Sequence, residues 1–321
     1  MNKTVLVTGA AGYVGSVVTE VLIDKGFKVI AVDNLSNGNE DAVDDALFIT
    51  DFADTELLDW AFTTQKIDFV IHLAALANIP DSIVNPLCTY EENVSKTIAL
   101  LDKMRQYSVK NILFTSSAAV FGEPAYQPID EQCAKRPISA YGRSKLMIEE
   151  VLKDCCRAYG INHVIFRYLN VAGATEKHGE SRPHESHLIP LVAKKALGGE
   201  TPLCVYGDKF NTQDGTGVRD YFHVLDIADA HLLAMEKIDE VKGNSFNLGS
   251  GEARSVLQII KGMELVSGVK IPYEIKPARE GDPSSLMANI SKAYRLLGWS
   301  PKRSLIEMLE SAYAWQKNRP Y

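Results

Sequence analysis

The feature that most constrains the fold is a glycine-rich turn near the start of the chain. The segment VLVTGAAGYVGSVV carries Gly9, Gly12 and Gly15 in a GxxGxxG spacing, after an apolar run and before a helical pattern. Glycine relieves the steric limits of a tight turn and lets backbone N–H groups approach a phosphate, and a third glycine allows close packing of helix on sheet. A strand, this turn and a helix in that order predict a dinucleotide-binding unit.

The second expected strand ends in an acid, Asp33, within VIAVDNLSNG. A carboxylate at this place accepts hydrogen bonds from both hydroxyls of an adenosine ribose and repels a 2′-phosphate. The sequence therefore predicts NAD as the cofactor, in preference to NADP.

Short apolar runs alternate with amphipathic stretches through the first half of the chain. The expected strands are Thr4–Thr8, Lys28–Asp33, Ala46–Thr50, Phe69–Leu73, Asn111–Ser116 and His163–Tyr168. The expected helices are Val14–Lys25, Asp54–Thr64, Tyr90–Tyr107 and Tyr141–Tyr159. Strands rich in Val, Ile, Leu and Phe that alternate with helices are typical of a parallel sheet covered on both faces. The predicted fold class is α/β, with a doubly wound parallel Rossmann sheet.

The alternation breaks after Asn170, where polar loops rich in glycine surround an expected helix over Leu188–Leu197. Long loops of this kind are usually functional. We expect residues 1–170, together with 219–245, to form an NAD-binding domain. We expect residues 171–218 and 246–321 to form a smaller mixed α/β domain that binds the substrate.

Charge and composition exclude several classes of function. The formal net charge of −7 argues against a nucleic-acid partner, and no apolar run approaches the roughly 20 residues that a membrane-spanning helix needs. The five cysteines are odd in number and irregular in spacing, which fits a reducing compartment better than a disulfide framework or a zinc site. His178, His184 and His187 lie close in sequence, but a polar loop entering a helix explains them and we expect no metal. A cytoplasmic enzyme is the expectation.

A tyrosine and a lysine lie four residues apart in SAYGRSKLMIEE, at Tyr141 and Lys145. On a helix this spacing places both side chains on one face. An ammonium beside a phenol favours the phenolate, so Tyr141 can serve as a base. Ser117 follows an expected strand, at the edge where parallel sheets bind ligands. Ser117, Tyr141 and Lys145 are therefore the candidate catalytic residues.

With these residues in this order, the chain resembles the extended short-chain dehydrogenase/reductase superfamily, and within it the UDP-glucose 4-epimerase family. The resemblance covers almost the full length. It is carried by HLAA from His72, EENVSKT from Glu91, SSAAVFGEP from Ser116, YGRSK from Tyr141, RYLNVAGA from Arg167, DGTGVRDYFHVLDIADAH from Asp214, FNLGSGEARSV from Phe246 and PAREGDP from Pro277. The segment from Asp214 is the most specific, because it is long and characteristic of the epimerases.

The resemblance implies reversible inversion of C4 of UDP-glucose and UDP-galactose through a transient 4-keto sugar, with recycled NAD. In it Tyr141 takes the proton of the sugar 4-hydroxyl, Ser117 bridges that hydroxyl and Tyr141, and Lys145 bonds the nicotinamide ribose. The implied cofactor-binding residues are Gly9, Gly12, Tyr13, Val14, Gly15, Asp33, Asn34, Leu35, Ser36, Asn37, Asp51, Phe52, Leu73, Ala74, Ala75, Asn93, Ser117, Tyr141, Lys145 and Leu169. The implied substrate-binding residues are Ser117, Tyr141, Asn170, His187, Leu188, Cys204, Val205, Tyr206, Arg219, Arg279, Asp282 and Leu286. The superfamily also implies a homodimer formed by the helices Tyr90–Tyr107 and Tyr141–Tyr159.

Departures from the family pattern leave the sugar open. Ala77 stands where many members carry a lysine, Leu169 where phenylalanine is frequent, and His187 where asparagine is frequent. Leu286 matches the position that limits room around C2 of the sugar. UDP-N-acetylglucosamine, UDP-xylose and UDP-arabinose remain alternative substrates.

The sequence argues against two other functions. A sugar-nucleotide 4,6-dehydratase needs an acidic pair after the catalytic Ser or Thr, and Ala118 and Ala119 cannot transfer a proton. A non-catalytic NAD-sensing protein is expected to lack at least one of Ser117, Tyr141 and Lys145, and all three are present.

Overall fold

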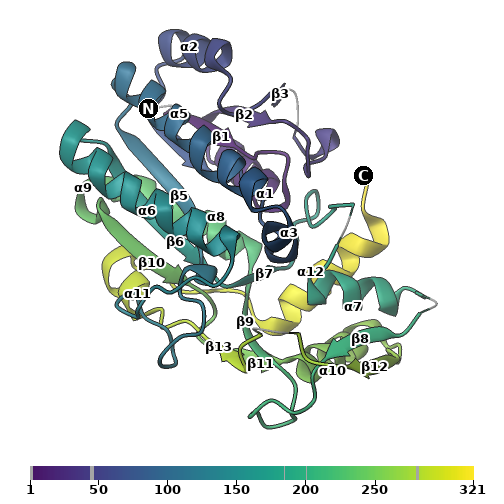
Figure 1. The fold of residues 1–321 in the computed structure, drawn as a ribbon. Coiled ribbons are helices and arrows are strands. Elements are labelled where there is room, and N and C mark those ends of the chain that lie inside the picture. The colour runs from purple at the N-terminus through teal and green to yellow at the C-terminus, as the bar shows by residue number, and fades with distance from the viewer. Residues whose placement is uncertain (1–2, 44–46, 184, 200, 280–281) are drawn as a thin grey trace.

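The computed structural model describes residues 3–43, 47–183, 185–199, 201–279 and 282–321. Its centre is a parallel sheet of seven strands in the order β10-β6-β5-β4-β1-β2-β3 (Figure 1). The strands are β1 (Thr4–Thr8), β2 (Lys28–Asp33), β3 (Leu47–Ile49), β4 (Phe69–His72), β5 (Asn111–Ser117), β6 (Asn162–Tyr168) and β10 (Asn244–Leu248). Every residue of β1 and of β4 is buried, as expected for central strands covered on both faces. The predicted doubly wound parallel sheet is confirmed.

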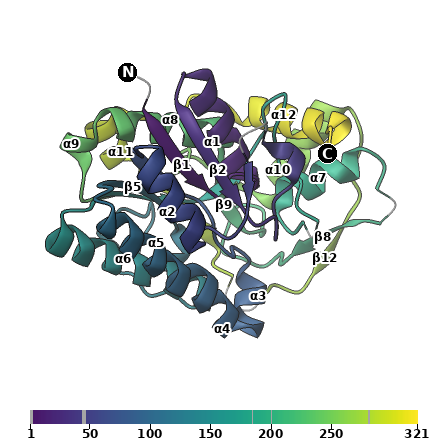
Figure 2. The same cartoon turned by 90° about the horizontal axis from the view of Figure 1, so that it is seen from above.

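Helices cover both faces of this sheet, because side chains alternate along each strand. Val5 and Val7 point into one core, which contains residues of α1 (Tyr13–Asp24) and α8 (Val224–Glu236). Leu6 points into the other core, with α2 (Thr55–Thr64), α5 (Lys96–Gln106) and α6 (Ala140–Tyr159). Figure 2 shows these two helical layers on opposite sides of the strands.

Smaller elements complete this part of the molecule. They are α3 (Ile79–Val84), α4 (Pro86–Tyr90), α9 (Ile238–Val241), α11 (Ser291–Leu297), short 3₁₀ turns at Glu40–Ala42 and Ala118–Val120, and a π-helical turn at Glu91–Ser95. The segment Tyr90–Tyr107, expected as one helix, thus begins with the end of α4 and the π-helical turn. Such turns are often found at functional sites.

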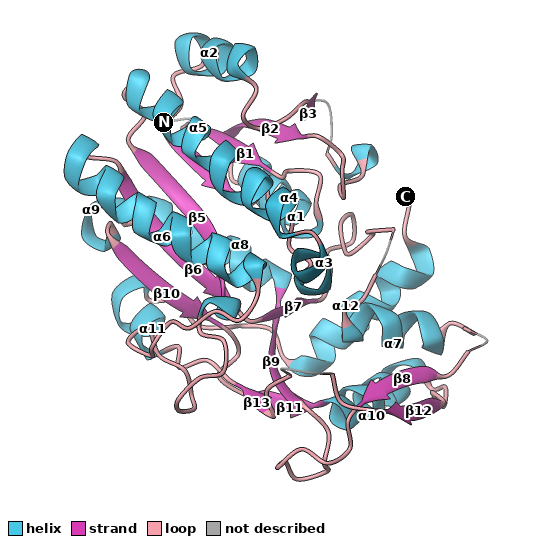
Figure 3. Cartoon of the chain, viewed as in Figure 1, coloured by secondary structure: helices cyan, strands magenta, loops and turns pink. Residues whose placement is uncertain are grey.

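The second part lies beyond the carboxyl ends of the large sheet and has its own core. Its strands are β7 (Asn170–Ala172), β8 (Leu203–Tyr206), β9 (Val218–His223), β11 (Ala253–Ser255), β12 (Tyr273–Lys276) and β13 (Ser285–Leu286). Its helices are α7 (Leu188–Ala196), α10 (Val256–Ser267) and α12 (Leu305–Asn318). β9 pairs with β7, β11 and β13, while β8 pairs with β12. Figure 3 shows the β8–β12 pair beside α7 and α10, away from the large sheet.

The boundary expected between the two domains cuts through one strand of the large sheet. The boundary between residues 245 and 246 falls inside β10, all of which pairs with β6 in the large sheet. β9, which was expected in the NAD-binding domain, lies instead in the smaller sheet. We therefore propose to count β10, α8 and α11 with the large sheet, and β9 with the second part. Among expected positions, Ala46, His184 and the pair at 280–281 lie outside the described residues.

Candidate active site

Two adjoining cavities lie where the two parts of the molecule meet, with volumes of about 350 Å³ and about 210 Å³. The larger cavity is lined at the carboxyl ends of five parallel strands, where α/β sheets of this kind bind ligands. Asn170, Val171, His187 and Pro190 line both cavities. A ligand in one cavity therefore lies next to a ligand in the other.

The glycine turn forms the floor of the larger cavity. Gly9 has φ +71°, and a Cβ on it would lie 2.6 Å from the backbone nitrogen of Ala74. A Cβ on Gly15 would lie 1.9 Å from the carbonyl oxygen of Gly9. The backbone thus comes so close together here that side chains are excluded, and α1 begins directly beneath the cavity. This arrangement fits the diphosphate of a dinucleotide.

Asp33 ends β2 and lines the larger cavity. Its buried carboxylate accepts hydrogen bonds from the backbone N–H groups of Ala11 at 3.0 Å and Leu35 at 2.8 Å. Burial raises the pKa of Asp33, and the backbone donors oppose that rise. Gly38 passes close by, since a Cβ there would lie 3.0 Å from Asp33 Oδ1. A fixed acceptor in this place fits the ribose hydroxyls of NAD.

The catalytic candidates meet at the other end of the same cavity. Ser139 caps α6, its side chain accepting from Gly142 N, and α6 then presents Tyr141 and Lys145 on one buried face. Lys145 Nζ donates to the carbonyl oxygen of Thr115 at 2.8 Å and lies 6.0 Å from the centre of the Tyr141 ring. Ser117 lines the cavity at the end of β5.

Burial works against the charged forms of both α6 side chains. Burial raises the pKa of Tyr141, and hydrogen bonding to Ser117 and the charge of Arg182 oppose that rise. Burial lowers the pKa of Lys145 to about 7, and Glu149 opposes that fall. A lysine with a pKa near neutrality can exchange a proton at working pH, which suits a group that tunes a catalytic phenol.

The low pKa of Lys145 predicts how stability depends on pH when no cofactor is bound. The folded pKa of about 7 lies below the ordinary 10.5, so the unfolded chain binds more protons between these values. Stability should therefore rise as pH increases through that window, and the penalty for burying Lys145 is largest below pH 7. Lys145→Met should stabilise the cofactor-free protein at pH 6.5, with a gain that shrinks by pH 9. Urea denaturation at both pH values measures this.

Lys153→Met, on the exposed part of α6, is the matched control. A gain from Lys145→Met that is the same at both pH values would show that the lysine is not buried in its charged form at the lower pH.

The smaller cavity has the polar and aromatic groups expected for a nucleotide diphosphate. The guanidinium carbon of Arg279 lies 4.0 Å from the centre of the Tyr206 ring, a stacking arrangement. Arg219 Nη2 lies 3.6 Å from Asp282 Oδ1. Two arginines on one cavity match a diphosphate in charge and in hydrogen-bond geometry.

Most of the expected site residues line one of the two cavities. In the larger cavity these are Gly9, Gly12, Tyr13, Val14, Gly15, Asp33, Asn34, Ser36, Asn37, Phe52, Leu73, Ala74, Ala75, Ser117, Tyr141, Lys145, Leu169, Asn170 and His187. In the smaller cavity they are Asn170, His187, Leu188, Cys204, Val205, Tyr206, Arg219, Arg279 and Asp282.

Four expected residues lie outside both cavity linings: Leu35, Asp51, Asn93 and Leu286. Asp51 is paired with Lys96 at 2.6 Å. Asn93 lies in the π-helical turn and holds both backbone polar groups of Leu76, a cavity residue, at 2.8 and 3.1 Å. Leu286 packs beside the core of Ala118 and Phe121. Asn93 thus supports the cavity wall from behind.

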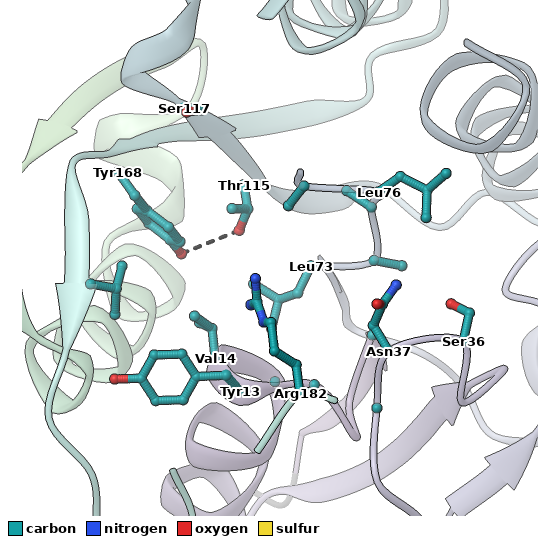
Figure 4. Close-up of a pocket in the computed structure, with 18 of the residues that line it drawn as sticks. Tyr13, Val14, Ser36, Asn37, Leu73, Leu76, Thr115, Ser117, Tyr168 and Arg182 are labelled. Atoms are coloured by element: carbon teal, nitrogen blue, oxygen red, sulfur yellow. Dashed lines mark hydrogen bonds between the residues drawn. The ribbon is translucent and has the colours of Figure 1, made fainter. Parts of the chain in front are cut away.

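The structure also brings in residues that the sequence reasoning missed. Tyr168, Glu180 and Arg182 line the larger cavity, and Phe210 and Tyr221 line the smaller one. Figure 4 shows Tyr168 across from Thr115, whose hydroxyl donates to Tyr168 Oη at 3.2 Å. Tyr168 ends an expected strand, so the argument that identified Ser117 would have identified it too.

Glu180, Glu185 and His187 place one ligand atom each within 4.8 Å of one another, a spacing that a metal ion could use. Each of them already has a partner in the protein, however. Glu180 is paired with Arg182 at 3.0 Å, and Glu185 Oε1 lies 2.7 Å from His187 Nδ1. We therefore propose that these contacts order the loop before α7.

Among the described residues, no helix is long and apolar enough to cross a membrane.

Comparison with known proteins identifies the family of this chain, and the matching relatives cover almost its whole length. The model of the NAD dependent epimerase/dehydratase family matches residues 5–249. A UDP-glucose 4-epimerase of Halalkalibacterium halodurans is 44% identical over 99% of this chain and 96% of its own length. The crystal structure of a UDP-glucose 4-epimerase from Bifidobacterium longum in complex with NAD⁺ and UDP is 38% identical, has a TM-score of 0.92, and is matched over 99% of both chains. Another UDP-glucose 4-epimerase structure has a TM-score of 0.95 at 38% identity, over 99% of this chain and 98% of that one. The chain therefore belongs to the NAD-dependent epimerase/dehydratase family.

Proposed function

We propose that this protein is an NAD-dependent UDP-glucose 4-epimerase, which interconverts UDP-glucose and UDP-galactose. The observation that carries the proposal is the junction of the two cavities. One contains the glycine turn, Asp33 and Tyr141, and the other contains Arg219 and Arg279. A UDP-sugar held by the two arginines can extend its hexose past Asn170 toward Tyr141.

The catalytic residues transfer and position a proton of the substrate while the hydride is transferred. Tyr141 removes the proton of the sugar 4-hydroxyl and later returns it, and Ser117 holds that hydroxyl against the phenol. Lys145, fixed by Thr115, lies on the same face of α6 and in its protonated form favours the phenolate of Tyr141. When bound, NAD would supply the group that accepts a hydride from C4 of the sugar and later returns it.

Inversion requires the 4-keto sugar to present its other face before the hydride returns. This needs a firm hold on the diphosphate and a loose hold on the hexose. The described lining fits this requirement, since Arg219 and Arg279 lie in the smaller cavity, while Leu169, Asn170 and Val171 near the junction carry no charge.

The proposal is tested by incubating the purified protein with UDP-galactose and analysing the products for UDP-glucose. The same assay with UDP-N-acetylgalactosamine, UDP-xylose and UDP-arabinose decides among the alternative sugars. An absence of C4 epimer from every UDP-sugar would refute the proposal and favour a non-catalytic NAD-sensing protein. A 4-keto-6-deoxy product would favour a dehydratase, which Ala118 and Ala119 argue against, since neither can transfer a proton.

Arg279→Ala should weaken the binding of the nucleotide much more than it slows the chemical step. Loss of a charged hydrogen-bonding partner of the diphosphate should raise KM for UDP-galactose and Kd for UDP by about 10- to 100-fold. The value of kcat should change by less than about fivefold, because the arginine acts far from C4. Steady-state kinetics and calorimetric titration of UDP measure both quantities.

Arg295→Ala, an exposed arginine on α11, is the control for a lost surface charge. A fall in kcat with unchanged Kd for UDP would contradict the proposed role of Arg279.

We also propose a homodimer, formed through the outer surface of α3, α4, α5 and α6. Ile83, Val84 and Leu87 are 66, 86 and 80% exposed, and Ile98 and Met147 add apolar surface on α5 and α6. These elements pack against one another, so the exposed apolar side chains gather on one side of the molecule. Sedimentation equilibrium should give about twice the 35.4 kDa of one chain.

The cytoplasm is the proposed location. All five cysteines are free thiols, at Cys88, Cys133, Cys155, Cys156 and Cys204, which suits a reducing compartment.

A further inference from the structure

Arg182 enters the larger cavity from the loop that joins β7 to α7. In Figure 4 its side chain points between Tyr13 and Asn37 toward Leu73, over the start of α1. It lines this cavity and not the smaller one, which has Arg219 and Arg279. Nothing in the sequence motifs had marked Arg182.

The loop that carries Arg182 is anchored at two places that precede this residue in the chain. The carbonyl oxygen of Glu180 accepts hydrogen bonds from Trp315 Nε1 and Gln316 Nε2, both at 3.0 Å. Earlier in the loop, Tyr13 Oη donates to the carbonyl oxygen of Gly173 at 2.6 Å. The position of Arg182 is therefore set by α12 and by the first turn of α1.

The side chain of Glu180 fixes one edge of the guanidinium. Glu180 Oε1 accepts from the backbone N–H of Arg182 at 3.0 Å and from Nε at 3.1 Å, while Oε2 lies 3.0 Å from Nη2. Among the described residues, none accepts a hydrogen bond from Nη1. The Arg182 side chain is 27% exposed, against 7% for Glu180. A held guanidinium with one free edge is prepared to bind an anion.

The charge of Arg182 acts across the cavity. Burial raises the pKa of Tyr13 and of Tyr141, and the Arg182 charge opposes the rise in both. The guanidinium thus lies within electrostatic reach of the start of α1 and of the proposed base. Lys145, the other Lys or Arg of the described lining, donates to Thr115 instead.

We propose that Arg182 is a cofactor-binding residue, whose free guanidinium edge pairs with the diphosphate of the bound dinucleotide while Glu180 holds the other edge. The diphosphate expected over the glycine turn lies below this side chain, and Lys145, the other Lys or Arg of the described lining, is already bonded to Thr115. Arg182 thereby ties the 173–187 loop to the cofactor. This inference rests on NAD binding and does not depend on which sugar is epimerised.

The test measures binding of three probes to the cofactor-free protein and to Arg182→Ala. NAD and ADP-ribose both carry the diphosphate, and adenosine carries none. We expect Arg182→Ala to raise Kd about tenfold or more for NAD and for ADP-ribose alike, and to leave adenosine unchanged. Arg182→Lys keeps the positive charge but loses the forked donors of the guanidinium, so it should lose less affinity for NAD and ADP-ribose than Arg182→Ala does. Glu180→Gln should weaken both diphosphate probes less than Arg182→Ala does.

Three results would overturn the inference. An unchanged Kd for NAD would make Arg182 a surface partner of Glu180 only. Tighter binding of NAD to Arg182→Ala would show that the side chain obstructs the cavity. Equal losses for adenosine and ADP-ribose would point to a general loosening of the loop. Epimerisation by the wild-type protein is assayed separately, so a failure here is distinguishable from failure of the proposed function.

Discussion

Replacing Tyr141 by phenylalanine should lower kcat for UDP-galactose by about a thousandfold while NAD stays bound, in line with the usual contribution of a general base. The substitution removes only the hydroxyl. The buried ring remains, and Lys145 keeps its bond to Thr115 and its place 6.0 Å from the ring centre. A loss of this size would therefore come from the missing proton acceptor, not from a collapsed cavity. A stopped-flow or discontinuous assay measures the product, and the NAD content is measured after gel filtration. Together they separate loss of the proton acceptor from collapse of the cavity.

Tyr159→Phe is the matched control, since Tyr159 is the last residue of the same helix and is 50% exposed. It should leave kcat unchanged. Near-normal turnover by Tyr141→Phe would refute the assigned base, and a loss of bound NAD together with turnover would assign Tyr141 to cofactor binding.

The parallel sheet could be predicted because its signals are local. β1 and β2 were expected with the bounds that the structure has, since a fully buried parallel strand is a short apolar run ended by turn residues. Asp33 was predicted for the same reason: a strand, a glycine turn and an acid occur in a fixed order. α3 and α4 were missed, because each is only one or two turns long and begins beside a proline.

The residues that the sequence did not reveal depend on packing between distant segments. Arg182 reaches the cavity because Trp315 and Gln316, more than a hundred residues later, hold the loop at Glu180. The buried pair of Glu149 and Arg167 likewise joins α6 to β6 beneath the site, with Ser116 bonded to the same carboxylate. No local pattern contains such pairings. The expected domain boundary falls within β10, whose motif FNLGSGEARSV runs from the large sheet into the second part.

Gly15→Ala should cost the protein its cofactor, because the added methyl group has no place to go. A Cβ there would lie 1.9 Å from the Gly9 carbonyl oxygen, 2.8 Å from the Gly9 carbonyl carbon and 2.9 Å from Ala10 Cα. These are backbone atoms, and alanine has no rotamer that avoids them, so α1 must move away from the turn. That shift moves the N–H groups that approach the diphosphate. We expect Kd for NAD to rise at least about 100-fold and the free energy of unfolding to fall by about 3 kcal/mol.

Gly26→Ala is the control. It tests a glycine with a left-handed backbone conformation whose Cβ would meet no neighbouring atom. Gly26 has φ +80°, and nothing lies within 4 Å of the position that its Cβ would take. It should cost about 1–2 kcal/mol of stability through backbone strain alone, with Kd for NAD unchanged. Titration of NAD and urea denaturation of both variants measure the two effects. If Gly15→Ala bound NAD as tightly as Gly26→Ala, the close approach of Gly9 and Gly15 would have no part in cofactor binding. The cofactor would then depend on other residues of the cavity, such as Asp33.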